Sequence, residues 1–294
     1  MQAEPKATAE KRTFDRTVEM SVKGMPTSDG AGVKLTRVLG TPKLPRLDPF
    51  LMLDDFRSDD PKDYLAGFPD HPHRGFETIT YMIAGNFRHR DNKGHEGFLR
   101  AGGAQWMTAG RGLVHSEMPE QVEGLVHGLQ LWLNLPAKDK MREPSYRDLQ
   151  PEDIPVAELA GDVRVHVLAG DVGGVHGPID GRATEPVYLD VEIPAGGAAA
   201  IPLPEGHEGF VYPIDGDVIV GPKGASDAKT LRGELGVLSE GGGVVLRATA
   251  GAPARAIVVA GKPIGEPVVQ YGPFVMNTYD EIREAVLDFQ AGKF

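Results

Sequence analysis

Asp70-His71-Pro72-His73-Arg74-Gly75-Phe76-Glu77 is the stretch that says most about this chain. Successive side chains of a β-strand point to opposite faces, so His71 and His73 face the same side and can bind one ion together. Pro72 stands between them on the other face and biases His71 toward an extended backbone. An isolated His-x-His strand is more often a surface or core feature than a metal site. The metal interpretation therefore depends on a second pair of ligands.

That second pair lies in Thr108-Ala-Gly-Arg-Gly-Leu-Val-His115-Ser-Glu117, where a glycine-rich turn leads into a strand. The same alternation puts His115 and Glu117 on one face, and two such pairs on neighbouring strands predict a four-ligand set. Three imidazoles and one carboxylate suit one divalent ion, Fe(II), Cu(II), Ni(II), Mn(II) or Zn(II), of which we expect Fe(II). An octahedral ion would keep two positions open for a chelating substrate or dioxygen.

Period-2 apolar patterning, which is typical of strands, dominates the rest of the sequence, as in residues 78–83, 128–135 and 187–193. Turn signals separate these runs at the spacing of an all-β sandwich or barrel. One helix is expected, near residues 278–290, with Thr278 as its N-cap and Gly292 after its end. The fold class is therefore all-β with a single C-terminal helix.

Charge and proline interrupt the strand patterning near residues 136–160, which favours an inter-domain connection there. We accordingly expect a loose tail over residues 1–14, a metal-binding barrel over 15–145 and a second barrel over 146–294. Tyr81-Met-Ile-Ala-Gly85 and Tyr212-Pro-Ile-Asp-Gly216 share a spacing, which suggests that the two halves are duplicates.

Composition excludes several classes of function. The formal net charge is -11 over 294 residues, which argues against direct nucleic-acid binding, since such proteins usually carry basic patches. With zero cysteines there are no thiolate ligands, disulfides or iron-sulfur clusters, so a metal must sit on nitrogen and oxygen. No apolar run approaches the roughly 18 residues of a membrane span, and the N-terminus lacks a signal-peptide core. We expect a cytoplasmic protein that does not bind membranes.

Four stretches resemble the signatures of the pirin family, and the resemblance spans nearly the whole chain. They are Gly67-Phe-Pro-Asp-His-Pro-His-Arg-Gly-Phe-Glu-Thr78, Gln105-Trp-Met-Thr-Ala-Gly-Arg-Gly-Leu-Val-His-Ser-Glu-Met-Pro119, His127-Gly-Leu-Gln-Leu-Trp-Leu-Asn-Leu-Pro136 and Gly272-Pro-Phe-Val-Met-Asn-Thr278. The resemblance implies two cupin barrels (jelly rolls, also called double-stranded β-helices) packed face to face in a monomer. It also implies one iron in the N-terminal barrel, on His71, His73, His115 and Glu117, and none in the C-terminal barrel.

Aligning the halves on Tyr81 and Tyr212 is consistent with a metal-free second barrel. The alignment sets Pro202 and Pro204 opposite the first histidine pair, and Leu246 and Ala248 opposite His115 and Glu117. None of these four side chains binds metal.

Two functions follow from the resemblance. In the first, the protein is an iron-dependent dioxygenase similar to quercetin 2,3-dioxygenase, which opens the ring of a flavonol with dioxygen and releases carbon monoxide. Glu117 would be the general base. Glu77 is a candidate pocket residue, as a second base or as a hydrogen-bond partner of a metal ligand; the alternative is an ionised residue at the barrel mouth. Phe68 could form an apolar wall of the pocket, and the family pattern places Gln130 in it.

In the second, the protein senses metal or redox state and binds a protein partner, without turnover that matters in the cell. The residues do not distinguish the two functions.

Overall fold

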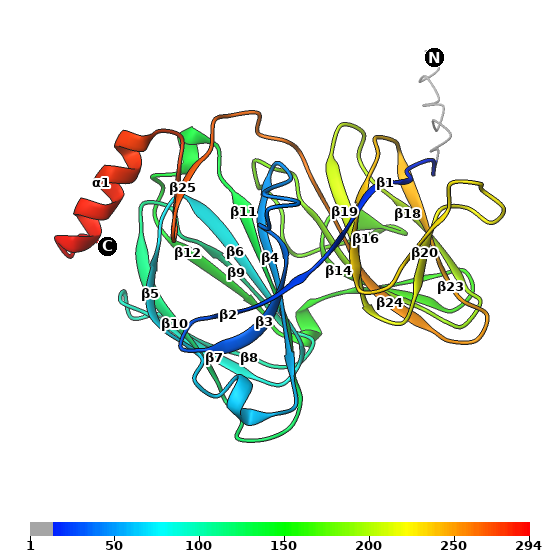
Figure 1. Ribbon diagram of the computed structural model, residues 1–294, viewed down its shortest axis with the longest axis horizontal. Coiled ribbons are helices and arrows are strands. Elements are labelled where there is room, and N and C mark those ends of the chain that lie inside the picture. The colour runs from blue at the N-terminus through cyan, green and yellow to red at the C-terminus, as the bar shows by residue number, and fades with distance from the viewer. Residues whose placement is uncertain (1–13) are drawn as a thin grey trace, which may run out of the picture.

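The computed structural model describes residues 14–294, so the expected tail over residues 1–14 lies outside the described range except for its last residue. The chain forms two β-sheet units side by side, the first drawn from blue to green and the second from green to orange in Figure 1. Each unit combines a seven-stranded with a four-stranded antiparallel sheet, the arrangement of a jelly roll. The all-β prediction is confirmed, and we refer to the units as the first and second barrel.

In the first barrel the seven-stranded sheet has the order β12-β9-β6-β11-β4-β3-β2, and the four-stranded sheet the order β5-β10-β7-β8. The strands of the larger sheet are β2 (Met25–Asp29), β3 (Val33–Leu39), β4 (Phe50–Ser58), β6 (Phe76–Ala84), β9 (Ala104–Thr108), β11 (Val126–Asn134) and β12 (Ser145–Leu149). Those of the smaller sheet are β5 (Phe68–His73), β7 (Phe87–Asp91), β8 (Glu96–Leu99) and β10 (Leu113–Pro119).

The second barrel repeats this arrangement, with the orders β1-β22-β19-β24-β17-β14-β13 and β18-β23-β20-β21. The larger sheet comprises β1 (Val18–Lys23), β13 (Val156–Leu159), β14 (Val163–Ala169), β17 (Val187–Ile193), β19 (Glu208–Asp215), β22 (Glu234–Leu238) and β24 (Ala254–Gly261). The smaller one comprises β18 (Ala198–Pro202), β20 (Val218–Val220), β21 (Lys229–Leu231) and β23 (Gly243–Ala248). Because β6 and β19 hold the same place in the two orders, the duplication inferred from Tyr81 and Tyr212 is present in the fold.

The remaining elements are short, apart from one helix. They are β15 (Asp171–Val172), β16 (Val175–His176), β25 (Val269–Tyr271), β26 (Phe274–Met276), the 3-10 helices η1 (Pro61–Asp63), η2 (Ala137–Asp139) and η3 (Pro151–Asp153), and α1 (Tyr279–Gln290). Thr278 caps α1 and forms a reciprocal capping box with Glu281. The single predicted helix is therefore confirmed.

Both ends of the described part of the chain join the opposite barrel. Strand β1 pairs with β22, so the first described strand completes the sheet of the second barrel. The C-terminal segment returns to the first barrel, where the Val275 N–H donates to the Arg74 carbonyl and α1 lies beside that barrel (Figure 1). The domain boundary between residues 145 and 146 stays a prediction. The predicted ranges 15–145 and 146–294 place β1 in the first barrel and the helix with the second, whereas the structure has each at the other barrel. Alternation in an edge strand does not say which sheet the strand joins.

The two large sheets face each other across an apolar interface. Leu129 and Leu131 of the first barrel belong to one buried cluster with Phe210, Ile257 and Val259 of the second. The interior of the second barrel is a separate cluster made almost entirely of Val, Leu, Ile and Ala. Within the described residues, the three metal-binding side chains close enough to share one ion all lie in the first barrel.

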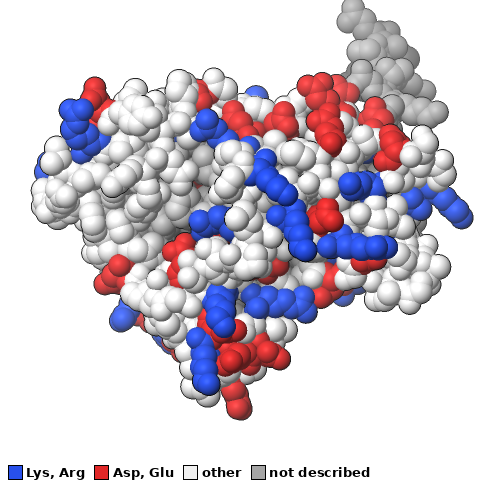
Figure 2. Space-filling view, viewed as in Figure 1, with Lys and Arg blue, Asp and Glu red and all other residues white. Residues whose placement is uncertain are grey.

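None of the helices in the described part of the chain is long and apolar enough to cross a membrane. On the face shown in Figure 2, Lys and Arg side chains run across the middle, with Asp and Glu among and above them. No single sign of charge covers that face.

Candidate metal centre

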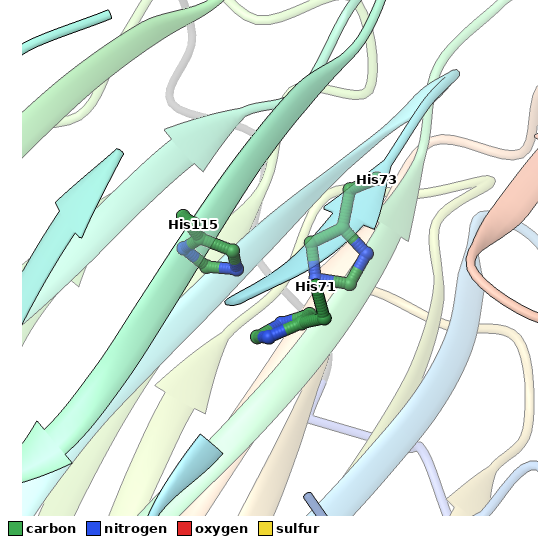
Figure 3. A group of neighbouring side chains, drawn as sticks. All are labelled: His71, His73 and His115. Atoms are coloured by element: carbon green, nitrogen blue, oxygen red, sulfur yellow. The ribbon is translucent and has the colours of Figure 1, made fainter. Parts of the chain in front are cut away.

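Three histidines of the first barrel converge at one point, His71 and His73 from β5 and His115 from β10 (Figure 3). Each offers a ring nitrogen, and these three atoms lie within 4.8 Å of one another. His73 and His115 are buried, whereas His71 is half-buried and reaches the pocket surface. The structure therefore assembles three of the four predicted ligands.

Strand pairing explains the convergence. His71 lies directly opposite His115 in the antiparallel pair of β5 and β10, and His73 is one strand repeat further along on the same face. Tight turns support both strands. A Cβ on Gly75 would lie 2.0 Å from the Val275 carbonyl oxygen, and one on Gly110 would lie 2.1 Å from that of Arg142. Both glycines also have positive φ angles. These glycines let the chain turn next to the histidines.

The donor set fits a divalent cation. His71 Nδ1 lies 2.8 Å from the Pro69 carbonyl oxygen, which can only accept, so this nitrogen carries the proton and leaves Nε2 free. Within residues 14–294, no hydrogen-bond partner reaches His73 Nδ1 or either ring nitrogen of His115. Burial, with His71 nearby, lowers the pKa of His73 and of His115 well below the usual value. Neutral, buried, unpaired imidazoles are what a metal site requires.

Glu117 is buried on the same strand as His115, but its carboxylate is not part of the three-histidine cluster. Thr80 Oγ1 donates to Glu117 Oε1 at 3.0 Å, and Gln130 Nε2 donates to Oε2 at 2.9 Å. Glu117 as fourth ligand consequently stays a prediction.

Small-molecule sites are usually clefts of about 300–1,000 Å³, and the cavity at the histidines measures about 860 Å³. His71 and His73 line it together with Phe68 and Gln130, the two pocket residues expected from the sequence. Its other walls include Met52 and Trp132 of the first barrel and Gln270, Gly272 and Pro273 of the C-terminal segment. The C-terminal crossing thus completes a pocket of the first barrel.

Glu77 does not lie in this pocket. It accepts from Thr108 Oγ1 at 2.6 Å and from Arg182 of the second barrel at 2.8 Å, and it is only 1% exposed. Its neighbour Phe76 packs against the Trp132 ring at the pocket side, so Glu77 points the other way, into the interface between barrels. The expectation of a base or a barrel-mouth residue is therefore wrong, and Glu77 is half of a buried inter-barrel ion pair.

Sequence reasoning missed two residues that shape the site. Thr80 binds Glu117, and Trp132 both lines the pocket and packs 5.3 Å from the His73 ring. Each had a signal in the alternation: Trp132 shares its strand face with Gln130, and Thr80 is a polar residue between the apolar residues Ile79 and Tyr81 of the other face.

A two-barrel fold of this kind, in which the one histidine cluster of the described residues lines a cavity of the first barrel, defines a bicupin with a candidate metal centre. The pirin family profile matches residues 32–133, and the profile of the pirin C-terminal cupin domain matches residues 188–294. The chain belongs to the pirin family.

Relatives cover the chain almost from end to end. A Pseudomonas aeruginosa protein provisionally named quercetin 2,3-dioxygenase is 53% identical over 92% of this chain and 94% of its own length. Human pirin is 43% identical over 95% of this chain and 93% of its own. The crystal structure of a quercetin 2,3-dioxygenase from Acinetobacter baumannii superposes with a TM-score of 0.85 at 31% identity, covering 95% of this chain and 98% of that one.

Proposed function

We propose that the protein is an Fe(II)-dependent dioxygenase that acts on a flavonol-type substrate. The observation that carries the proposal is the cluster of three histidines at the wall of an 860 Å³ cavity, with the buried carboxylate of Glu117 on the same strand as His115. The names of the Pseudomonas and Acinetobacter relatives support the same reaction.

His71, His73 and His115 would hold the ion, and Glu117 would complete the set. When bound, the ion would supply open positions for an oxygen-chelating substrate and for dioxygen. The donor set also accommodates Cu(II), Ni(II), Mn(II) and Zn(II), so the assignment of iron comes from the proposed oxygen chemistry.

Glu117 is suited to take the proton of a substrate hydroxyl. Its two hydrogen bonds come from neutral donors, Thr80 and Gln130, and a carboxylate has about four acceptor sites, so acceptor capacity remains. Removal of the 3-hydroxyl proton makes the flavonol electron-rich. In the overall reaction both atoms of dioxygen enter the products, and one ring carbon leaves as carbon monoxide.

The cavity walls suit a flat aromatic ring. Phe68 and Trp132 offer aromatic surface, and Met52 adds a deformable apolar contact. Such walls would orient the substrate by shape and leave recognition of its oxygens to the ion and Glu117.

The test is a turnover assay on protein reconstituted with Fe(II) under anaerobic conditions, then mixed with quercetin and oxygen. We expect carbon monoxide and loss of the flavonol absorbance from the wild type, with neither from Glu117→Ala. The control is Glu123→Ala, an exposed carboxylate on the loop after β10. Metal binding without turnover across a panel of flavonols would overturn the enzyme proposal and favour a metal-sensing protein that acts through a protein partner.

A further inference from the structure

A row of polar side chains crosses the seven-stranded sheet of the first barrel next to Glu117. In spatial order across β3, β4, β11, β6, β9 and β12, it consists of Arg37, Asp54, Gln130, Thr80, Gln105 and Asp148, each directly paired with the next. Directly paired residues of neighbouring strands point to the same face. Since Gln130 lines the cavity, the row faces the barrel interior.

The second barrel shows that the fold does not need this row. Because Tyr81 and Tyr212 are equivalent, Val211 corresponds to Thr80, and its partner Val258 corresponds to Gln130. The same pairing continues outward through aliphatic residues and one glycine, namely Val167, Leu189 and Gly236. Burying polar groups in place of these is unfavourable unless each finds a partner. The fold alone therefore does not explain the polar row, and we attribute the row to a function of the first barrel.

Glu117 is held from the middle of the row. Thr80 Oγ1 and Gln130 Nε2 donate to different oxygens of the carboxylate, which fixes its plane. Trp132 Nε1 lies 3.4 Å from Gln130 Oε1. An indole N–H only donates and a carboxylate only accepts, so the Gln130 amide has one orientation that satisfies both neighbours.

We propose that Gln130 and Thr80 are positioning residues that prepare Glu117 for the metal ion, with Trp132 setting the orientation of the Gln130 amide. The inference rests on the proposed metal binding by Glu117. A carboxylate clamped at both oxygens has less conformational freedom to lose when it binds an ion, and donor partners of this kind strengthen metal binding in other proteins.

The test measures Ni(II) affinity by titration calorimetry, which does not depend on turnover. We expect Gln130→Leu and Thr80→Val to weaken Ni(II) binding about tenfold each, and Thr80→Ser, which keeps the hydroxyl, to retain near wild-type affinity. Thr80→Val introduces the residue that the second barrel carries at this place. Gln105→Leu is the matched control, because it removes a buried amide of the same row that binds Asp148 and not Glu117.

A double-mutant cycle then asks whether the effect passes through Glu117. In a Glu117→Ala background, Gln130→Leu should cause no further loss of Ni(II) affinity. Two results would overturn the inference while the metal site stands. One is unchanged or tighter Ni(II) binding in Gln130→Leu and Thr80→Val. The other is a loss of Ni(II) affinity in these variants no greater than that in Gln105→Leu. A wild type that binds no Ni(II) would instead remove the metal site itself.

Discussion

Tyr81 Oη donates a 2.7 Å hydrogen bond to Asp190 Oδ2 across the interface between the two barrels. The reverse contact is also present, since Tyr212 Oη of the second barrel donates to Asp55 Oδ2 of the first at 2.7 Å. The two bonds connect equivalent strands in opposite directions, as expected of a duplicated unit packed on its copy. Burial, and secondarily the carboxylate partner, raises the pKa of Tyr81 and of Tyr212, so both remain donors at ordinary pH.

Removing either donor should loosen the barrel interface. We expect Tyr81→Phe and Tyr212→Phe each to lower the free energy of unfolding by about 1.5–3 kcal/mol, because each leaves a carboxylate at the interface short of a hydrogen bond. Urea unfolding followed by tryptophan fluorescence measures the change. Tyr279→Phe is the control, since Tyr279 is 79% exposed and should be neutral within about 0.5 kcal/mol. Equal midpoints for all three variants would contradict a structural role for these bonds.

The two-barrel fold could be predicted because alternation survives in nearly every central strand, as in β17 (Val187–Ile193). The partner of β1 could not. Its pattern fits the edge of either large sheet, and the choice depends on pairing with β22, more than 200 residues away in sequence. The return of the C-terminal segment to Arg74 could not be predicted either, because it depends on backbone hydrogen bonds between residues far apart in sequence.

The histidine cluster could be predicted because His71, His73 and His115 lie within single strands, where parity is reliable. Glu77 has the parity of His73, but the turn at Gly75, with a φ of 89°, lies between them and resets the direction of the side chains. Alternation counted across a turn therefore does not say which face of the sheet a side chain lies on. The sequence also could not show that Glu77 contacts Arg182, because that contact depends on how the two barrels pack.

Glu77 should matter for stability and not for metal binding. We expect Glu77→Gln to lower the free energy of unfolding by about 3 kcal/mol, because the change leaves the partly buried Arg182 guanidinium without its carboxylate. Ni(II) affinity should stay at the wild-type value, since Glu77 points away from the cavity. Glu143→Gln, which removes an exposed ion pair with Arg111, is the control and should cost little. Weakened Ni(II) binding in Glu77→Gln would return this residue to the metal site.

Lys140 should give stability a distinct pH dependence. Its buried Nζ donates to the carbonyl oxygens of Gly75 and Val275 and to Asn134 Oδ1, at 2.7–3.0 Å, and so ties the C-terminal segment to the first barrel. Burial lowers the pKa of Lys140 from 10.5 to about 8. Between these two values the unfolded chain binds a proton that the folded protein does not, so this group makes stability rise with pH there.

Lys140→Met should remove that rise. We expect the urea midpoint of the wild type to increase relative to that of the variant as the pH goes from 7.5 to 9.5. Lys138→Met, at an exposed position two residues earlier, should follow the wild type throughout. Parallel curves for the wild type and Lys140→Met would show that the Lys140 ammonium stays protonated in the folded state over this range.

Metal binding should stabilise the first barrel through His115. Both ring nitrogens of this buried side chain lack a hydrogen-bond partner in the described structure, and its ring lies 4.4 Å from that of His71. A ligand at 100 times its dissociation constant adds about 2.7 kcal/mol to the stability of the state that binds it. Saturating Ni(II) should therefore raise the melting temperature of the wild type, and a chelator should reverse the shift.

His115→Ala and His73→Ala should show neither the shift nor bound metal by mass spectrometry. His176→Ala, whose side chain is 63% exposed in the second barrel, should keep both. A full Ni(II) shift in His115→Ala would place the ion elsewhere, because a three-histidine site cannot lose one imidazole without loss of affinity.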